Sequence, residues 1–158
     1  MNLPFELKLT PDTFFLIWLV FAFFLLSVFV ISGILVLRKF PSLNDVNVFF
    51  RERWASGNSH DTFIHKYGGA INALDIIITE KELWIKPFLL VAGFSSIYGL
   101  IRKIQITDIR EVSSKNELIV IHFVNESGSM SEFHLKLKSK RQFLKVITDK
   151  MPETIVNQ

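Results

Sequence analysis

The feature that most constrains this chain is an uninterrupted apolar run from Phe14 to Leu37. None of its 24 residues is charged, and nineteen of them are Phe, Leu, Ile or Val. As an α-helix the run would be about 36 Å long at 1.5 Å per residue, which exceeds the roughly 30 Å of a bilayer's hydrocarbon core. No water-soluble domain of a 158-residue chain has an interior large enough to cover such a helix on every side. We therefore expect residues 14–37 to cross a membrane with some tilt.

The charges that flank this run predict its orientation. A single lysine, Lys8, precedes the run, whereas Arg38 and Lys39 follow it immediately. Because Lys and Arg are enriched in loops that stay in the cytoplasm, we expect the N-terminal tail (1–13) outside and the rest of the chain inside. The run is too long for a signal peptide, has no basic region before it and no A-x-A cleavage site after it. An uncleaved, single-pass anchor in the plasma (inner) membrane is therefore expected.

Composition limits the chemistry open to the rest of the chain. The absence of cysteine excludes disulfides, thiolate catalysis and Cys-ligated metal centres. A net formal charge of only +3 argues against a nucleic-acid partner and fits weak attraction to an anionic membrane surface better. No G-x-S-x-G, G-x-G-x-x-G or Walker motif is present. We expect no enzyme activity, no cofactor and no small-molecule substrate.

Residues 38–61 are expected to form a juxtamembrane linker. Ser42 and Asp45 resemble a helix-capping pair, so a short amphipathic helix is predicted over residues 44–55. This helix would either rest in the lipid headgroups or serve as a connector packed on the following domain. Its apolar residues would lie largely on one side: Val46, Phe49, Phe50 and Trp54.

Residues 62–151 show a strand-like hydrophobic period and are expected to form a folded domain, followed by a tail at 152–158. Within residues 102–112, a kink at Thr107–Asp108 is needed to keep the alternating apolar residues on one face. The segment 140–151 has apolar residues at helical spacing, which predicts a helix, capped by Ser139, that closes one side or end of the sheet. The predicted strands are 62–67, 72–79, 83–87, 102–112, 117–125 and 131–139.

The last two predicted strands suggest a specific register. A three-residue loop centred on Gly128 would bury six apolar residues on one face of the hairpin. The expected pairs are Phe133 with Phe123, Leu135 with Ile121, and Leu137 with Ile119.

The same register would place His122 opposite His134 on the other face, close to Glu132. Two histidines and a carboxylate are residue types that bind zinc, but a metal site needs three or four converging ligands. A surface cross-strand pair is the favoured interpretation, and no metal is expected.

Two stretches, 75–88 (DIIITEKELWIKPF) and 102–112 (RKIQITDIREV), resemble the pleckstrin-homology (PH) superfold, in particular bacterial PH-like and GRAM-like domains. In such proteins a strand commonly ends in a phrase of the form I-x-x-x-D-I-x-x-V. The resemblance implies a membrane-anchored α+β fold, with a PH-like antiparallel sheet or barrel over residues 62–151 capped by a C-terminal helix. It also implies binding of lipid headgroups or proteins without catalysis. The K-x-K-x-R run of phosphoinositide-binding PH domains is not matched here.

A second apolar stretch, residues 87–101, allows three interpretations. As a second span it would be short and would split the strands of the domain. A strand plus loop within the sheet is favoured. The third interpretation is a loop inserted into the membrane interface or into a partner protein, with its flanking cations at headgroup phosphates. The lipid or partner contacts would then be Lys86, Phe88, Leu89, Leu90, Phe94, Tyr98, Arg102 and Lys103.

The sequence thus favours a non-enzymatic module that docks on the inner leaflet or on a membrane-bound protein partner. The alternative is a structural or accessory subunit of a larger membrane complex, in which the span and residues 87–101 pack on neighbouring chains. An enzyme with an unrecognised arrangement of residues is the third and least favoured class.

Overall fold

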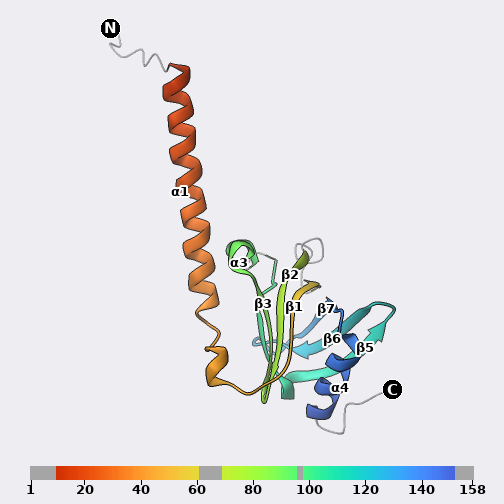
Figure 1. Cartoon of the computed structure of the whole chain (residues 1–158). Helices are drawn as coiled ribbons and strands as arrows, with labels where there is room; N and C mark the ends of the chain where they lie inside the picture. Colours follow the sequence, from red (N-terminus) through yellow and green to blue (C-terminus); the bar gives the residue numbers. More distant parts are fainter. Residues whose placement is uncertain (1–9, 61–68, 96–97, 152–158) are drawn as a thin grey trace.

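The computed structural model describes residues 10–60, 69–95 and 98–151, without the side chains of Leu90 and Phe94. The strand predicted at 62–67 lies outside these ranges. One long helix projects beyond a curled sheet, and a helix near the C-terminus packs on the sheet (Figure 1).

The long helix, α1, extends from Pro11 to Leu37. Thr10 caps its start, since the Thr10 side chain accepts a hydrogen bond from the backbone N–H of Thr13 at 3.3 Å. The Ser27 hydroxyl donates to the Phe23 carbonyl at 2.8 Å, so this polar group is satisfied inside the helix. Within the described ranges, α1 is the one helix long and apolar enough to cross a membrane.

Seven antiparallel strands form one sheet in the order β4-β3-β2-β1-β7-β6-β5. Strands β1 to β4 form one meander, β5 to β7 form a second, and the pairing of β1 with β7 joins the two. This sheet, with an apolar N-terminal helix and a C-terminal helix, is the α+β layout predicted from the sequence. The elements are β1 (Val48–Ser59), β2 (Gly69–Thr79), β3 (Glu82–Pro87), β4 (Arg102–Gln105), β5 (Ile109–Lys115), β6 (Leu118–Val124), β7 (Met130–Lys136) and α4 (Lys140–Lys150).

The main hydrophobic core draws residues from every strand and from α4. Phe143 and Ile147 of α4 are fully buried, and the Phe143 ring meets Phe50 of β1 edge-on with centroids 5.4 Å apart. Burial of each such side chain stabilises the fold by about 1.5–3 kcal/mol. The predicted C-terminal helix is therefore confirmed, and its apolar stripe closes the core.

The start of α4 is capped by a residue of β1 rather than by the predicted Ser139 side chain, which makes no capping bond. The Glu52 carboxylate, only 8% exposed, accepts the backbone N–H groups of Lys138 at 2.7 Å and Ser139 at 2.8 Å. A negative charge at this end of the helix also offsets the basic residues of the first turn. Glu52 thus joins β1 to α4.

The short segment after α1 packs on the outer face of the sheet. Phe40 is 8% exposed and meets Trp84 of β3 edge-on, with ring centroids 5.8 Å apart. Ile77 of β2 completes this second cluster, and Leu43 and Val46 pack against it. The connection between α1 and the domain is therefore fixed by apolar contacts.

The short helix predicted over residues 44–55 is wrong. A 3-10 turn, η1 (Leu43–Asp45), is followed directly by strand β1. Burial alternates through Phe50 and Glu52 until a bulge at Trp54, whose φ is 64°, shifts the phase. The bulge interrupts the alternation of buried and exposed residues that is typical of a strand. The hydrogen bonds of β1 with a strand on each side outweigh the helical spacing of its apolar residues. The sheet therefore begins inside the predicted linker.

The stretch 102–112, predicted as one kinked strand, is two strands. The 3-10 turn η2 (Ile106–Asp108) separates β4 from β5 at the position where the sequence required a kink. After this turn the chain changes place in the sheet, because β4 pairs with β3 at one edge and β5 pairs with β6 at the other.

The β6–β7 hairpin differs from its predicted register by two residues. Ile121 pairs with Phe133, because a five-residue loop replaces the predicted three-residue loop. The Asn125 side-chain oxygen shapes this loop by accepting the backbone N–H groups of Ser127 and Ser129, each at 3.0 Å. A shift of two keeps each side chain on its predicted face, so the predicted burial is correct although the partners are wrong.

Candidate membrane-facing site

A short helix, α3 (Leu89–Ser95), follows β3 and lies against α1 (Figure 1). Two glycines permit this contact. A Cβ on Gly33 would lie 2.8 Å from the carbonyl oxygen of Leu89, and a Cβ on Gly93 would lie 2.8 Å from the carbonyl oxygen of Phe29. The two backbones therefore touch, in the way that small residues allow in membrane helix pairs.

Beyond Pro87, which ends β3, the described part of residues 87–101 is thus neither a strand nor a second span. The Phe88 carbonyl accepts the backbone N–H groups of Val91 and Ala92, each at 2.9 Å, and so opens a helix directly after β3. A helix of seven residues is about 10 Å long and is too short to cross a bilayer. The favoured prediction of a strand plus loop was wrong here because a short apolar run has no period that separates buried strand from helix.

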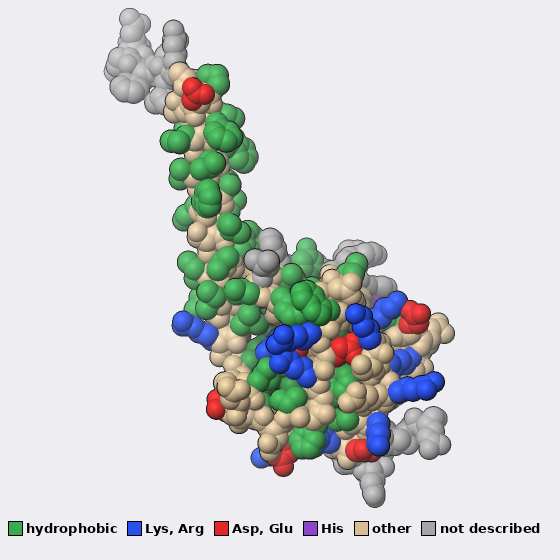
Figure 2. Space-filling view, in the orientation of Figure 1, with side chains coloured by type: hydrophobic (Ala, Val, Ile, Leu, Met, Phe, Trp, Pro, Cys, Tyr) green, Lys and Arg blue, Asp and Glu red, His purple; other side chains and the backbone are tan. Residues whose placement is uncertain are grey.

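A cavity of about 330 Å³ lies between the end of α1 and the sheet; we call it the foot cavity. Its apolar walls come from the end of α1, the segment after it and the start of α3, and its polar lining comes from β1, β2 and β3. Figure 2 shows Lys and Arg side chains gathered below the foot of the apolar helix, next to hydrophobic ones. The lining residues are Leu37, Phe40, Pro41, Arg51, Arg53, Asp75, Lys86, Pro87, Phe88 and Leu89.

Three cations surround one carboxylate in this cavity. Asp75, 3% exposed, accepts two hydrogen bonds from Arg51, Nε to Oδ1 at 3.0 Å and Nη2 to Oδ2 at 2.8 Å. These bonds raise the pKa of Arg51. Lys86 Nζ lies 3.9 Å from Asp75 Oδ2. Burial, aided by the charges of Arg51 and Arg53 and opposed by Asp75, lowers the pKa of Lys86.

Arg53 is an exposed cation of this group. Its guanidinium makes no ion pair with a carboxylate in the part of the chain that the structure describes. Three positive groups and one negative group give the cavity lining a formal charge of +2. Such a lining favours an anionic ligand with an apolar portion that can lie along the wall near α3.

Exposed aromatic and aliphatic side chains continue this surface toward α3. Trp54 is 57% exposed, and its ring lies on Phe88 with centroids 4.4 Å apart. The left-handed backbone at Trp54 is uncommon for a bulky residue and turns its side chain outward at the bulge. Leu89 and Tyr98 are also exposed. Tryptophan and tyrosine are enriched where proteins meet the membrane interface.

The structure does not bring all the predicted contact residues together. Lys86, Phe88 and Leu89 line the foot cavity, whereas Arg102 and Lys103 line a different one beside the β6–β7 loop. The side chains of Leu90 and Phe94 lie outside the described residues.

The two remaining predicted cations have protein partners of their own. Arg102 Nη2 lies 3.4 Å from the Ser59 hydroxyl. Lys103 Nζ lies 3.1 Å from Glu82 Oε1, at the opposite end of β3 from α3. Neither cation belongs to the group around Asp75.

Sequence reasoning missed Arg51 and Arg53 as site residues, because both fall within the helix predicted over residues 44–55. In a strand, residues two apart lie on the same face, and these arginines flank the buried Glu52 in that way. An R-x-R spacing within a correctly assigned strand would have placed both cations on one face, and the pairing of β1 with β2 then brings that face beside Asp75. Arg38 and Lys39, the pair expected from the sequence to set the topology, are exposed at the end of α1.

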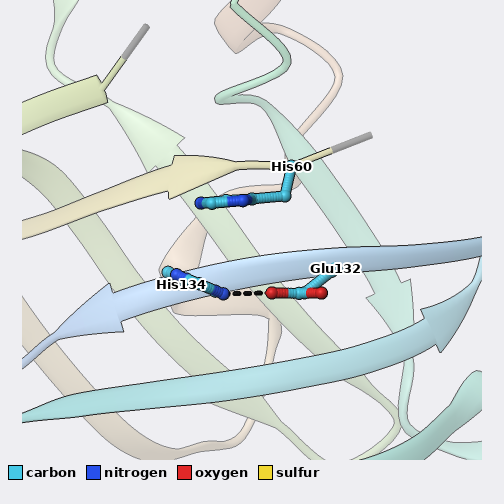
Figure 3. A group of neighbouring side chains, drawn as sticks. All are labelled: His60, Glu132 and His134. Carbon is cyan, nitrogen blue, oxygen red and sulfur yellow. Dashed lines mark hydrogen bonds and ion pairs between the residues drawn. The ribbon is translucent and has the colours of Figure 1, made fainter. Parts of the chain in front are cut away.

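A second polar group lies where β1 meets β7, and consists of His60, Glu132 and His134 (Figure 3). His134 Nε2 is hydrogen-bonded to Glu132 Oε1, and the His60 and His134 rings stack with centroids 4.0 Å apart. The predicted pairing of His122 with His134 is wrong, because His122 lies opposite Glu132 and His134 lies opposite Val120. This follows from the shifted hairpin register.

The charge of Glu132 is set by these neighbours. Burial acts to raise the pKa of Glu132, but the hydrogen bond with His134 and the charges of the surrounding histidines outweigh it and lower the pKa. The group therefore presents an ionised carboxylate beside two imidazoles.

Comparison with known proteins gives weak likeness to solved structures only. No family profile matches the chain, and no curated protein matches it. Among solved structures, the chain is similar to the complex of the FERM and C-terminal domains of Drosophila Merlin, with a TM-score of 0.39 and 15% identity. The match covers 67% of this chain and 30% of the Merlin chain.

Proposed function

We propose that this protein is a non-enzymatic, single-pass membrane protein whose PH-like domain docks on the inner leaflet and holds an anionic phospholipid headgroup in the foot cavity. The observation that carries the proposal is the group of three cations around Asp75, directly beneath the end of an apolar helix. Arg38 and Lys39 favour a cytoplasmic domain and an outer N-terminus in the inner membrane. The resemblance to bacterial PH-like and GRAM-like domains is consistent with such a role.

The depth of α3 along α1 supports a position at the membrane surface. The contact residues Phe29 and Gly33 lie eight and four residues before Leu37, which corresponds to about 12 Å and 6 Å along the helix. The apolar run exceeds the bilayer hydrocarbon by roughly 6 Å in total. When α1 crosses the bilayer, α3 therefore lies at the boundary of acyl chains and headgroups, the depth typical of interfacial helices.

The foot cavity then faces the headgroup layer. Each Lys or Arg near an anionic leaflet contributes about 1 kcal/mol of attraction, and Asp75 offsets one of the three cations. The apolar wall formed by Phe88 and Leu89 suits the glycerol and first methylenes of a lipid, while Arg53 and Lys86 suit its phosphate. Anchoring comes from α1, so this site supplies selectivity and orientation rather than membrane attachment.

Lipid retention by the full chain tests this proposal. The protein would be extracted in mild detergent, mixed with equal amounts of phosphatidylglycerol and phosphatidylcholine, and analysed for bound lipid by native mass spectrometry. We expect a preference for the anionic lipid that falls by about thirtyfold in the double variant Arg53→Gln/Lys86→Gln, since two cations at about 1 kcal/mol each are removed. Arg51 is left intact because its loss would strand the buried Asp75 charge.

The matched control is Arg141→Gln/Lys145→Gln, which removes two exposed charges from α4. This control should keep the preference. Equal loss in both double variants, or none in either, would contradict a specific headgroup site. A protein retained in stoichiometric amount, without any lipid preference, would support the alternative role as an accessory subunit of a membrane complex.

A further inference from the structure

We propose that His60, Glu132 and His134 bind a divalent transition-metal ion of the Zn²⁺ class, which ties the two halves of the sheet together. This site is separate from the foot cavity and does not depend on the proposed lipid function. Figure 3 shows the three side chains gathered over the paired strands β1 and β7.

The donor set and its spacing suit zinc. Two imidazole nitrogens and one carboxylate oxygen are a set of three protein ligands that zinc accepts, with a fourth position left for water. The three candidate donor atoms already lie within 4.8 Å of one another. In a tetrahedral site with metal–ligand bonds near 2.0–2.1 Å, donors are about 3.3 Å apart. Side-chain rotations alone can close this difference, because each residue turns about two or more χ angles.

The backbone fixes the positions of all three residues. Asn58 pairs with His134 and Ser59 with Phe133, and the His60 N–H donates to the Glu132 carbonyl at 2.9 Å. Glu132 and His134 flank the fully buried Phe133 and so share the opposite face of β7. Backbone hydrogen bonds of the β1–β7 pairing therefore hold the three residues in place, which lowers the ordering cost of binding an ion.

Neighbouring side chains complete the surroundings of the site. The Asn58 Nδ2 group donates to Nε2 of His60 at 2.9 Å, so a metal bound through Nε2 would displace this hydrogen bond. His122 lies directly across from Glu132 on β6 and brings a third imidazole to the same face. An ordinary hydrogen bond would explain why Glu132 and His134 lie together. The His60 ring, stacked on His134, adds a third candidate metal ligand to this pair.

The location gives the ion a structural role. The pairing of β1 with β7 is what joins the four-stranded and three-stranded meanders. An ion held by His60, one residue beyond the end of β1, and by Glu132 and His134 of β7 would cross-link this junction. Because the site does not exist in the unfolded chain, metal binding favours the folded state, and the unfolding temperature should rise with zinc concentration.

Metal titration of the full chain, in detergent and without a histidine tag, tests this inference. We expect one equivalent of Zn²⁺ by calorimetry, a higher unfolding temperature, and a Co²⁺ absorption spectrum of four-coordinate form. Glu132→Gln and His134→Gln should each weaken Zn²⁺ binding by at least about tenfold. His122→Gln, which removes a histidine outside the three-donor set, should weaken it less.

The inference would be overturned if the wild-type chain bound no more Zn²⁺ than the double variant His60→Gln/His134→Gln. It would also be overturned if bound Co²⁺ kept the spectrum of the hydrated ion. The Co²⁺ spectrum of the wild-type chain decides the matter even where a variant fails to fold. Loss of zinc binding with an unchanged lipid preference would separate this site from the foot cavity.

Discussion

Gly93 of α3 lies so close to Phe29 of α1 that a Cβ in its place would be 2.8 Å from the Phe29 carbonyl oxygen. This contact lies about 12 Å before the end of α1, and the packing of Phe40 on Trp84 lies just beyond that end. The sheet is therefore joined to the long helix at two heights. Rotation of the domain about the intervening chain would break one of these contacts.

Replacing Gly93 with valine should separate α3 from α1. The added side chain meets a backbone carbonyl that cannot yield as a flexible side chain could, and overpacking of this kind costs about 1–3 kcal/mol. Amide hydrogen exchange of residues 89–95 in detergent or nanodiscs should accelerate. Gly69→Ala is the control, since its Cβ would meet its nearest neighbour at an ordinary 3.4 Å. Unchanged exchange in the valine variant would contradict the tight α1–α3 contact.

Truncation of Phe40 should loosen the second connection. Phe40→Ala removes the edge-on contact with Trp84 and most of a small apolar cluster, so the free energy of unfolding should fall by about 3 kcal/mol. Urea unfolding in mild detergent, followed by tryptophan fluorescence, measures this loss. Phe49→Ala provides a matched control, because Phe49 is 48% exposed and its main contact is the Lys150 ammonium over its ring. The control should lose about 1 kcal/mol or less; equal losses would show that the cluster around Trp84 does not hold the segment.

The elements that the sequence predicted correctly are those whose pattern is local. Residues 14–37, the hairpin of β2 and β3, and the stripe of α4 each show their own period, so their type could be assigned without knowing their neighbours. The type of strand β1 could not be assigned in this way. The bulge at Trp54 breaks its alternation, and its two partner strands come from other parts of the chain.

The candidate sites were predictable only in part, for the same reason. Lys86 was found because it borders an apolar stretch, whereas Arg51 and Arg53 join it only through the pairing of β1 with β2. His60 reaches Glu132 through the pairing of β1 with β7. Contacts between distant strands depend on register, and single-chain patterns do not determine register between non-adjacent strands.

Neutralising Glu52 should weaken the attachment of α4. Glu52→Gln keeps the size of the side chain but leaves one of two backbone N–H groups facing an amide that cannot accept its bond. A buried donor without a partner costs about 1–3 kcal/mol. Urea unfolding measures this change, with the exposed Glu111→Gln as control. A loss no greater than in the control would mean that Ser139 and solvent cap α4 unaided.

The acid sensitivity of the domain should depend on Glu82. Burial acts to raise the pKa of Glu82, but hydrogen bonds from Trp84 at 2.8 Å and Gln105 at 2.7 Å, with the Lys103 ion pair, outweigh it and lower the pKa below the ordinary value of 4.5. A carboxyl with a depressed folded pKa stabilises the fold above its unfolded pKa, and this contribution is lost as the pH falls through the folded pKa. Glu82→Gln should therefore cost about 1 kcal/mol at pH 7 and flatten the decline in stability below pH 4.5. Urea unfolding at a series of pH values, with the exposed Glu80→Gln as control, measures both effects. If the free energy of unfolding fell as steeply with decreasing pH in the Glu82 variant as in the wild type, other carboxylates would be responsible for the acid sensitivity.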